Sequence, residues 1–184
     1  MRKSVRDFVK TISETIECPG PIWEFGSYQV KGQEAIADLR IFFPGKKYVG
    51  VDVRPGPGVD MIYDAQKIDL PDGCIGTVLM MDTLEHIENP IKACQEISRI
   101  LKPDGVFICS TVMNFSIHDH PADYFRFTPE GLTLLMYQFS PKKVMTLGYE
   151  VNPHTVAGVG FKNQEFDITK LALPLKTWKK IWNK

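Results

Sequence analysis

The sequence predicts an α/β fold in which a doubly wound, mostly parallel sheet of seven strands ends in an antiparallel hairpin. Strand-like apolar runs alternate with helix-like patterns along most of the 184 residues, as in sheets built from strand–helix–strand units. Two runs, 76–82 and 105–112, are almost continuously apolar, which indicates strands buried on both faces. The last two strand patterns are separated only by a short turn, so they are expected to pair antiparallel.

The first half of the chain is expected to contain a helix ahead of the sheet and three strands within it. The first twenty residues interleave charged and apolar positions, which indicates a helix rather than a signal peptide. Ala35, Ile36, Leu39 and Phe42 lie at helical spacing. The expected elements are strands at 22–26, 47–53 and 59–65, and a second helix at 33–43.

The second half is expected to contain two capped helices and four strands. Asn89 is a good N-cap, and Pro90 suits the first helical position after it. Ile91, Cys94, Ile97 and Leu101 are expected to share one apolar face of that helix. The expected elements are strands at 76–82, 105–112, 142–151 and 154–162, a helix from Pro90 to the Pro103-Asp-Gly105 turn, and a helix over 128–139 capped by Thr128.

Length and composition indicate one domain over 1–184, with an N-terminal helix at 1–21, an α/β core at 22–162 and a tail at 163–184. Lys plus Arg and Asp plus Glu number 22 each, so the strong positive charge of a nucleic-acid-binding protein is missing. No run approaches the apolar length of a membrane span. The four cysteines form no C-x-x-C pair, so reduced thiols and a cytoplasmic location are expected.

Acidic residues stand at or just after the ends of four predicted strands. They are Glu24, Asp52, Asp64 and Asp82. In a doubly wound sheet, ligands bind at the carboxyl ends of the strands, near the point where strand order reverses. A carboxylate after the second strand is placed to accept hydrogen bonds from the two hydroxyls of a ribose. The sequence therefore indicates a ligand that contains adenosine.

The loop after the first strand narrows the choice of ligand. A dinucleotide needs the closely spaced glycines of G-x-G-x-x-G, so that the backbone can approach its pyrophosphate. Here Gly26 and Gly32 are six residues apart, and Ser27 follows the first of them. A ligand without phosphates makes no such demand, and one with an ammonium group and a sulfonium favours nearby carboxylates. S-adenosylmethionine satisfies both conditions.

A family resemblance supports the same ligand. The run "EFGSYQVKG" from Glu24 to Gly32 fits the pattern E-x-G-S-x-x-x-x-G, and the likeness continues through 48–112 and through "HDHPADYFRFTPEGL" at 118–132. In these segments the chain resembles class I S-adenosylmethionine-dependent methyltransferases, in the type 11-like branch. The resemblance covers roughly residues 22–136. It implies a Rossmann-like sheet, methyltransferase activity and S-adenosylmethionine as cofactor.

The resemblance also implies which residues hold the cofactor. Glu24 and the backbone at Gly26 and Ser27 would face the methionine part. Asp52 would take the ribose hydroxyls, and Asp82 would line the pocket beneath the sulfonium. Around the adenine, the implied residues are Val53 against the ring, Asp64 at the amino group and Ala65 with its backbone amide.

The acceptor side is expected in the segment after the fifth strand. Candidate bases are His86, His118 and His120, with Glu85 and Asp119 as further candidates. Candidate substrate contacts are Asp119, Tyr124 and Arg126. Arg126 has an equally weighted alternative, a structural ion pair with Asp123 or Glu130. No metal is expected, because neighbouring loop residues rarely supply a whole site and methyl displacement needs no ion.

The favoured function is in-line methyl transfer from S-adenosylmethionine to a small-molecule or glycan/natural-product acceptor. One alternative is a catalytically silent methyltransferase-like subunit. Another is an NAD(P)-dependent oxidoreductase, against which the missing phosphate-binding glycines argue. Trp178 and Trp182 in the tail are expected to dock on the sheet or to form a subunit contact, which leaves room for a homodimer.

Overall fold

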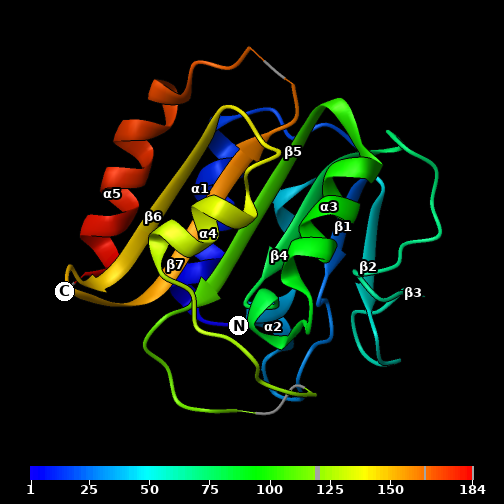
Figure 1. Ribbon diagram of the computed structural model, residues 1–184, viewed down its shortest axis with the longest axis horizontal. Helices are drawn as coiled ribbons and strands as arrows, with labels where there is room; N and C mark the ends of the chain where they lie inside the picture. The colour runs from blue at the N-terminus through cyan, green and yellow to red at the C-terminus, as the bar shows by residue number, and fades with distance from the viewer. Residues whose placement is uncertain (119–120, 164, 184) are drawn as a thin grey trace.

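The structure is a computed structural model that describes residues 1–118, 121–163 and 165–183. In these residues seven strands form one sheet, in the order β3-β2-β1-β4-β5-β7-β6 (Figure 1). The first five strands run parallel, and β7 pairs antiparallel with both β5 and β6, so the predicted fold class is confirmed. The strands are β1 Ile22–Phe25, β2 Tyr48–Asp52, β3 Met61–Ile62, β4 Ile75–Met81, β5 Leu101–Val112, β6 Lys142–Tyr149 and β7 Asn152–Phe161.

Helices cover the sheet on both faces. The α-helices are α1 Lys3–Thr15, α2 Glu34–Ala37, α3 Pro90–Ile100, α4 Pro129–Leu135 and α5 Ala172–Trp182, and the 3-10 helices are η1 Arg40–Phe42, η2 Leu84–His86 and η3 Ile168–Leu171. Figure 1 shows α3 and α4 in front of the sheet and α1 behind it. The N-caps Asn89 and Thr128 accept backbone hydrogen bonds from Lys92 and Gly131, so both predicted helix starts are confirmed.

Strand order reverses at β1, and this reversal positions the site. β1 pairs in parallel with β2 on one side and with β4 on the other, so the chain leaves the sheet in opposite directions around it. At such a point the loops after neighbouring strands separate and leave a crevice at their carboxyl ends. The sheet itself is rigid there, because every residue of β1 and β4 is buried.

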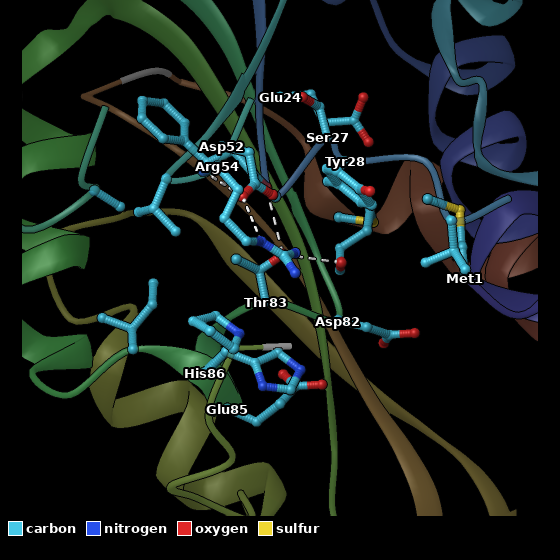
Figure 2. Close-up of a pocket in the computed structure, with 18 of the residues that line it drawn as sticks. Met1, Glu24, Ser27, Tyr28, Asp52, Arg54, Asp82, Thr83, Glu85 and His86 are labelled. Carbon is cyan, nitrogen blue, oxygen red and sulfur yellow. Dashed lines mark hydrogen bonds and ion pairs between the residues drawn. The ribbon is translucent and has the colours of Figure 1, made fainter. Parts of the chain in front are cut away.

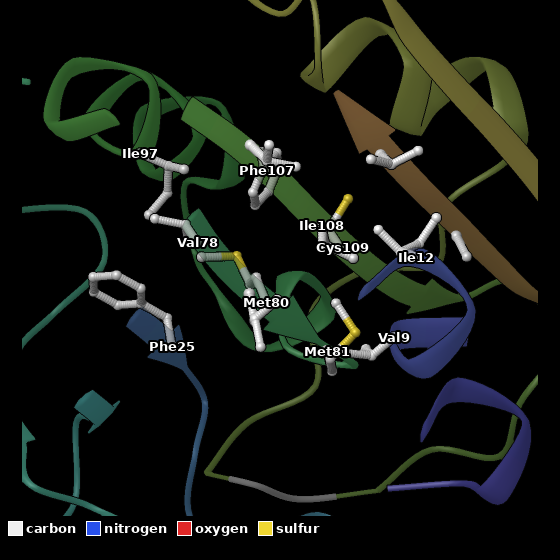
Figure 3. Close-up of a cluster of buried hydrophobic side chains, with 14 of the residues drawn as sticks. Val9, Ile12, Phe25, Val78, Met80, Met81, Ile97, Phe107, Ile108 and Cys109 are labelled. Carbon is white, nitrogen blue, oxygen red and sulfur yellow. The ribbon is translucent and has the colours of Figure 1, made fainter. Parts of the chain in front are cut away.

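The core lies on both faces of β4 and β5. Figure 3 shows Val78 beside Ile97 of α3, and Met81 beside Val9 of α1. Full burial of a large apolar side chain contributes about 1.5–3 kcal/mol, so this packing fixes the strand ends that carry the site.

The C-terminal helix docks on the N-terminal one. The ring of Trp178 packs on Phe8 with centroids 5.0 Å apart, and its indole Nε1 donates to the carbonyl of Ser4 at 2.8 Å. The tail therefore packs within its own chain through Trp178. None of the helices in the described ranges combines the length and apolarity that a bilayer crossing needs.

The expected helix over 33–43 is wrong in its length. Only Glu34–Ala37 is α-helical, and a 3-10 turn follows at Arg40–Phe42. Asp38 separates the two pieces, because its backbone is extended and its carboxylate accepts from the amide of Arg40 at 3.0 Å. Such a side-chain bond competes with the helical pattern.

Two expectations about α3 are also wrong. Ile91 is 53% exposed rather than buried, and the helix ends at Ile100, so Leu101 is already in β5. β5 runs through the expected 103–105 turn with an irregular register against β4.

Candidate functional site

A cavity of about 700 Å³ opens at the carboxyl ends of β1, β2 and β4. Its volume is in the range of small-molecule sites. The lining combines carboxylates with hydroxyl and aromatic side chains, and Figure 2 shows many of them. The predicted residues Glu24, Gly26, Ser27, Asp52, Val53, Asp64, Ala65, Asp82, His86, His118 and Tyr124 all line it.

The turn after β1 is held tightly against β4. Gly26 has φ +83°, and a Cβ there would lie 2.2 Å from Thr83 Oγ1. The amides of Gly26 and Ser27 both donate to the carbonyl of Val51, at 2.8 and 3.0 Å. Only glycine combines this backbone conformation with this close approach.

Ser27 presents an unsatisfied hydroxyl. The side chain is 4% exposed and lines the cavity, and its Oγ has no hydrogen-bond partner among the described residues. A buried hydroxyl without a partner costs about 1–3 kcal/mol, so such atoms normally have one. This atom therefore fits a ligand that supplies a polar group beside the β1 turn.

Glu24 is buried at 3% exposure and accepts a hydrogen bond from the hydroxyl of Tyr48 at 2.6 Å. Burial raises the pKa of Glu24 to about 7, and the Tyr48 bond opposes part of that rise. An ammonium group entering the cavity would favour the charged carboxylate and lower this pKa.

The raised pKa of Glu24 predicts a pH-dependent stability. Because the folded pKa of about 7 exceeds the usual 4.5, Glu24 stabilises the fold fully below pH 4.5 and loses that contribution as pH rises through 7. Between these limits its effect on the free energy of unfolding is roughly 3 kcal/mol. Glu24→Gln should remove this part of the pH dependence in urea melts of both proteins from pH 4.5 to 8. A stability difference that stays constant over that range contradicts the assignment.

Asp52 ends β2 at the edge of the cavity. Its Oδ1 accepts from the backbone amide of Arg54 at 3.0 Å and from the Arg54 side chain at 3.3 Å. The Arg54 guanidinium lies over the ring of Tyr28, 4.6 Å from its centroid. These contacts fix the carboxylate, which is 8% exposed, against the cavity wall.

The residues expected around an adenine come from the ends of β2 and β3. Val53 is 50% exposed and lines the cavity with an apolar surface. Asp64 accepts from the amide of Gln66 at 2.8 Å and from its side chain at 3.1 Å. Ala65 beside it is buried. Asp64 is therefore engaged in a local turn and still faces the cavity.

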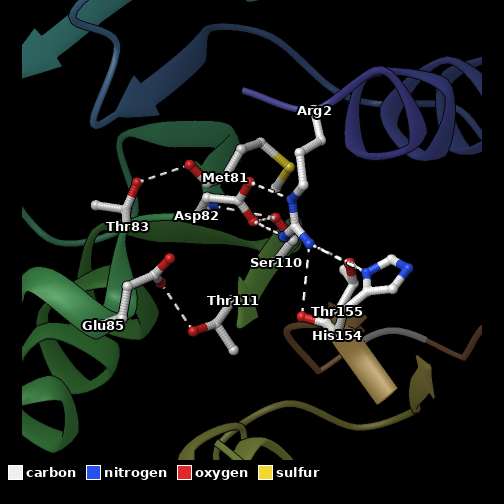
Figure 4. A network of polar contacts seen from close by, with 9 residues as sticks. All are labelled: Arg2, Met81, Asp82, Thr83, Glu85, Ser110, Thr111, His154 and Thr155. Carbon is white, nitrogen blue, oxygen red and sulfur yellow. Dashed lines mark hydrogen bonds and ion pairs between the residues drawn. The ribbon is translucent and has the colours of Figure 1, made fainter. Parts of the chain in front are cut away.

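Asp82 is the centre of a polar network that reaches the N-terminus (Figure 4). It has φ +48°, and its carboxylate accepts from Arg2 at 2.8 Å and from Ser110 at 2.8 Å. Arg2 also donates to Thr155 at 2.5 Å. This network ties α1 to the ends of β4, β5 and β7 across one side of the cavity.

Glu85 is fully buried in η2. Its Oε2 accepts from Thr111 at 2.8 Å, whereas its Oε1 lacks a hydrogen-bond partner in the described part of the chain. Burial, reinforced by the charge of Asp82, raises the pKa of Glu85 to about 8.

The loop after β5 brings His118 against His86. Their rings meet edge to face with centroids 4.8 Å apart. Tyr124 is 47% exposed and donates to Glu88 at 3.0 Å. The predicted residues Asp119 and His120 lie outside the residues that the structure describes.

Arg126 does not line the cavity. Its guanidinium pairs with Asp123 at 2.5 and 2.7 Å, which is the alternative that the sequence left open. This pair holds the pKa of Asp123 well below its usual range. A substrate contact for Arg126 stays a prediction.

Met1, Arg2, Tyr28 and Thr83 are among the cavity residues that sequence reasoning missed. Arg2 meets Asp82 across 80 positions of sequence, a distance that no local pattern reveals. A signal for Thr83 was present in the sequence. Gly26 stands at a strand end, and a glycine there often marks a place where another segment approaches the backbone closely, as Thr83 does.

Residues 34–109 match the family model described as a methyltransferase domain. No curated protein sequence matches the chain.

Several solved structures share the fold. A S-adenosylmethionine-dependent methyltransferase from Thermotoga maritima, described as a possible histamine N-methyltransferase, has a TM-score of 0.61 and 21% identity over 86% of this chain and 91% of its own. A S-adenosylmethionine-dependent methyltransferase from Archaeoglobus fulgidus has a TM-score of 0.64 and 14% identity, over 85% and 94% of the two chains.

A third structure includes ligands. The 1,6-didemethyltoxoflavin-N1-methyltransferase of Burkholderia thailandensis, solved with 1,6-didemethyltoxoflavin and S-adenosylhomocysteine, has a TM-score of 0.64 and 15% identity over 88% of this chain and 80% of its own. At these identities the likeness concerns the fold.

Proposed function

We propose that this chain, a class I S-adenosylmethionine-dependent methyltransferase, transfers the methyl group to a small-molecule acceptor by in-line displacement. When bound, the cofactor would supply a methyl group attached to a positively charged sulfur. The methyl group passes to the acceptor, and the sulfur remains in a neutral thioether, the leaving group. The residues of the chain then have to hold the donor and align the acceptor, which alone lowers the barrier substantially.

The cofactor side of this proposal uses the β1, β2 and β4 ends. Asp52 accepts hydrogen bonds from the ribose hydroxyls. Glu24 and the Ser27 hydroxyl bind the methionine part. Val53, Asp64 and Ala65 surround the adenine, and Asp82 lies near the sulfonium. The observation that carries the proposal is the fixed, buried Asp52 at the end of β2, with the unpartnered Ser27 Oγ in the same cavity.

The acceptor side uses the loop after β5. Phe115 and Tyr124 are 44% and 47% exposed and both line the cavity, so they offer ring faces to a flat or apolar acceptor. His86 and His118 stand beside them as candidate bases for an acceptor that loses a proton. Two proteins of similar fold are described as methyltransferases of small nitrogen-containing molecules, a possible histamine N-methyltransferase and the 1,6-didemethyltoxoflavin-N1-methyltransferase, which supports the small-molecule class. The proposal includes a glycan or natural product that has a flat or apolar ring to place against Phe115 and Tyr124.

Formation of S-adenosylhomocysteine in a screen of small heterocyclic amines and phenols tests this function. Once an acceptor is found, Tyr124→Ala should raise its KM about tenfold by removing a ring face, while the Kd for S-adenosylhomocysteine stays unchanged. Tyr137→Ala is the matched control, because Tyr137 is exposed and does not line the cavity. Equal effects of both variants contradict the acceptor assignment.

The NAD(P)-dependent alternative makes an opposite prediction. Saturable binding of NADH, detected by quenching of tryptophan fluorescence, together with no binding of S-adenosylhomocysteine, would favour it.

A homodimer remains a prediction, and sedimentation equilibrium measures the oligomeric state directly.

A further inference from the structure

A carboxylate and two imidazoles gather at the β4 and β5 end of the cavity. Glu85 and His86 come from η2, and His118 comes from the loop after β5. One oxygen or nitrogen atom from each of the three side chains lies within 4.8 Å of the others, and all three line the cavity. Figure 2 shows Glu85 and His86 beside each other.

The Glu85 carboxylate is incompletely satisfied. It is fully buried, Thr111 donates to Oε2 at 2.8 Å, and Oε1 has no hydrogen-bond partner within the described ranges. The Arg2 guanidinium forms its ion pair with the nearby Asp82 rather than with Glu85. A buried carboxylate that lacks a paired charge is costly, so a cation at Oε1 would relieve it.

The two imidazoles are oriented as metal ligands usually are. Nδ1 of His118 faces Asp123 Oδ2 at 3.2 Å and the Ser116 carbonyl at 3.1 Å, and Nδ1 of His86 contacts the Ala122 carbonyl. These oxygens accept hydrogen bonds, so Nδ1 carries the proton and Nε2 the lone pair in both neutral rings. A carboxylate or carbonyl behind the ring is the typical outer contact of a ligating histidine.

The outer contacts are themselves fixed. Asp123 has a side-chain exposure of 2% and is bound by both terminal nitrogens of Arg126. Arg126 also donates to the carbonyl of Ser116 at 3.1 Å. The loop that carries His118 is thus held by a partly buried ion pair, which reduces the freedom of its imidazole.

We propose that Glu85, His86 and His118 bind a divalent transition-metal ion, with Zn²⁺ as the best match. Two imidazoles and one carboxylate form a donor set that binds Zn²⁺ in proteins and leaves a further position open. Ligand atoms of a tetrahedral zinc site lie about 3.4 Å apart, so binding draws these side chains together by about 1 Å. All three side chains line the cavity. A metal-bound imidazole cannot also accept a proton, so a bound ion excludes His86 and His118 as bases in the same molecule.

Titration of the purified protein with Co²⁺ tests the site, because Co²⁺ in a tetrahedral site absorbs visible light. The wild type should bind one ion per chain, and Zn²⁺ should displace it. Glu85→Gln, His86→Gln and His118→Gln should each weaken Co²⁺ binding about 10- to 100-fold or more. His154→Gln is the matched control. His154 is the one histidine of the sequence that belongs neither to η2 nor to the loop after β5, and it does not line the cavity.

Three results overturn the proposal. They are no stoichiometric binding by the wild type, unchanged binding by Glu85→Gln, and equal weakening by His154→Gln. If the site variants fail to fold, NMR of the wild type decides the question. On addition of Zn²⁺, at least two histidine ring signals should shift while that of His154, assigned from its variant, stays. If no histidine signal shifts, or if all shift alike, the proposal is wrong.

Discussion

Gly26→Ala should abolish detectable binding of S-adenosylhomocysteine and lower the stability of the fold. A Cβ at this position would lie 2.2 Å from Thr83 Oγ1 and 2.9 Å from its Cγ2, at φ +83°. The left-handed backbone alone costs about 1–2 kcal/mol for a residue other than glycine. The clash displaces the turn from β4, and the turn carries Ser27 into the cavity. Calorimetric titration and thermal melting measure the two effects.

A double variant separates the clash from the backbone strain. Gly26→Ala combined with Thr83→Ala removes the two closest atoms and should recover part of the affinity and stability. Gly45→Ala is the matched control, because Gly45 also has a positive φ, of 74°, but open space at its Cβ. It should cost only the backbone strain and leave affinity unchanged. If Gly26→Ala binds as tightly as the wild type, the β1 turn is not part of the cofactor site.

Asp52→Ala should weaken binding of S-adenosylhomocysteine about 10- to 100-fold, since hydrogen bonds to a charged group contribute about 1.5–3 kcal/mol. The expected loss is specific, because the carboxylate is 8% exposed and, among the described residues, Arg54 is its side-chain partner. Arg54 itself is 36% exposed, so solvent replaces its partner at little cost. Isothermal titration of both proteins under the same conditions gives the ratio.

Asp104→Ala is the control for Asp52→Ala. Asp104 is an exposed carboxylate at the opposite end of β5, outside the cavity. The control should bind as the wild type does, and both variants should melt close to it. Equal affinity for the Asp52 and Asp104 variants means that Asp52 does not hold the ribose.

Local patterns predicted the sheet because its strands are defined by short, nearly continuous apolar runs. The β4 and β5 runs were predicted within a few residues, and the hairpin of β6 and β7 was recognised from its short turn. Helix boundaries were predicted less well where a side chain intervened. Asp38 broke one helix by capping the amide of Arg40, and no periodicity in the sequence reports that bond.

The candidate site was predicted where one residue sits at one strand end, as Asp52 does. It was missed where two distant segments combine. Arg2 reaches Asp82 across 80 positions of sequence, because α1 lies behind the sheet. The pairing of Glu85 with two histidines likewise depends on how the loop after β5 folds back over η2.

A crystal structure of the wild type with S-adenosylhomocysteine tests the proposed cofactor site directly. The ligand should lie in the cavity at the carboxyl ends of β1, β2 and β4. Both ribose hydroxyls should lie within hydrogen-bond distance of the Asp52 carboxylate, with the methionine part beside Ser27. A ligand bound elsewhere, or a ribose turned away from Asp52, would contradict the account.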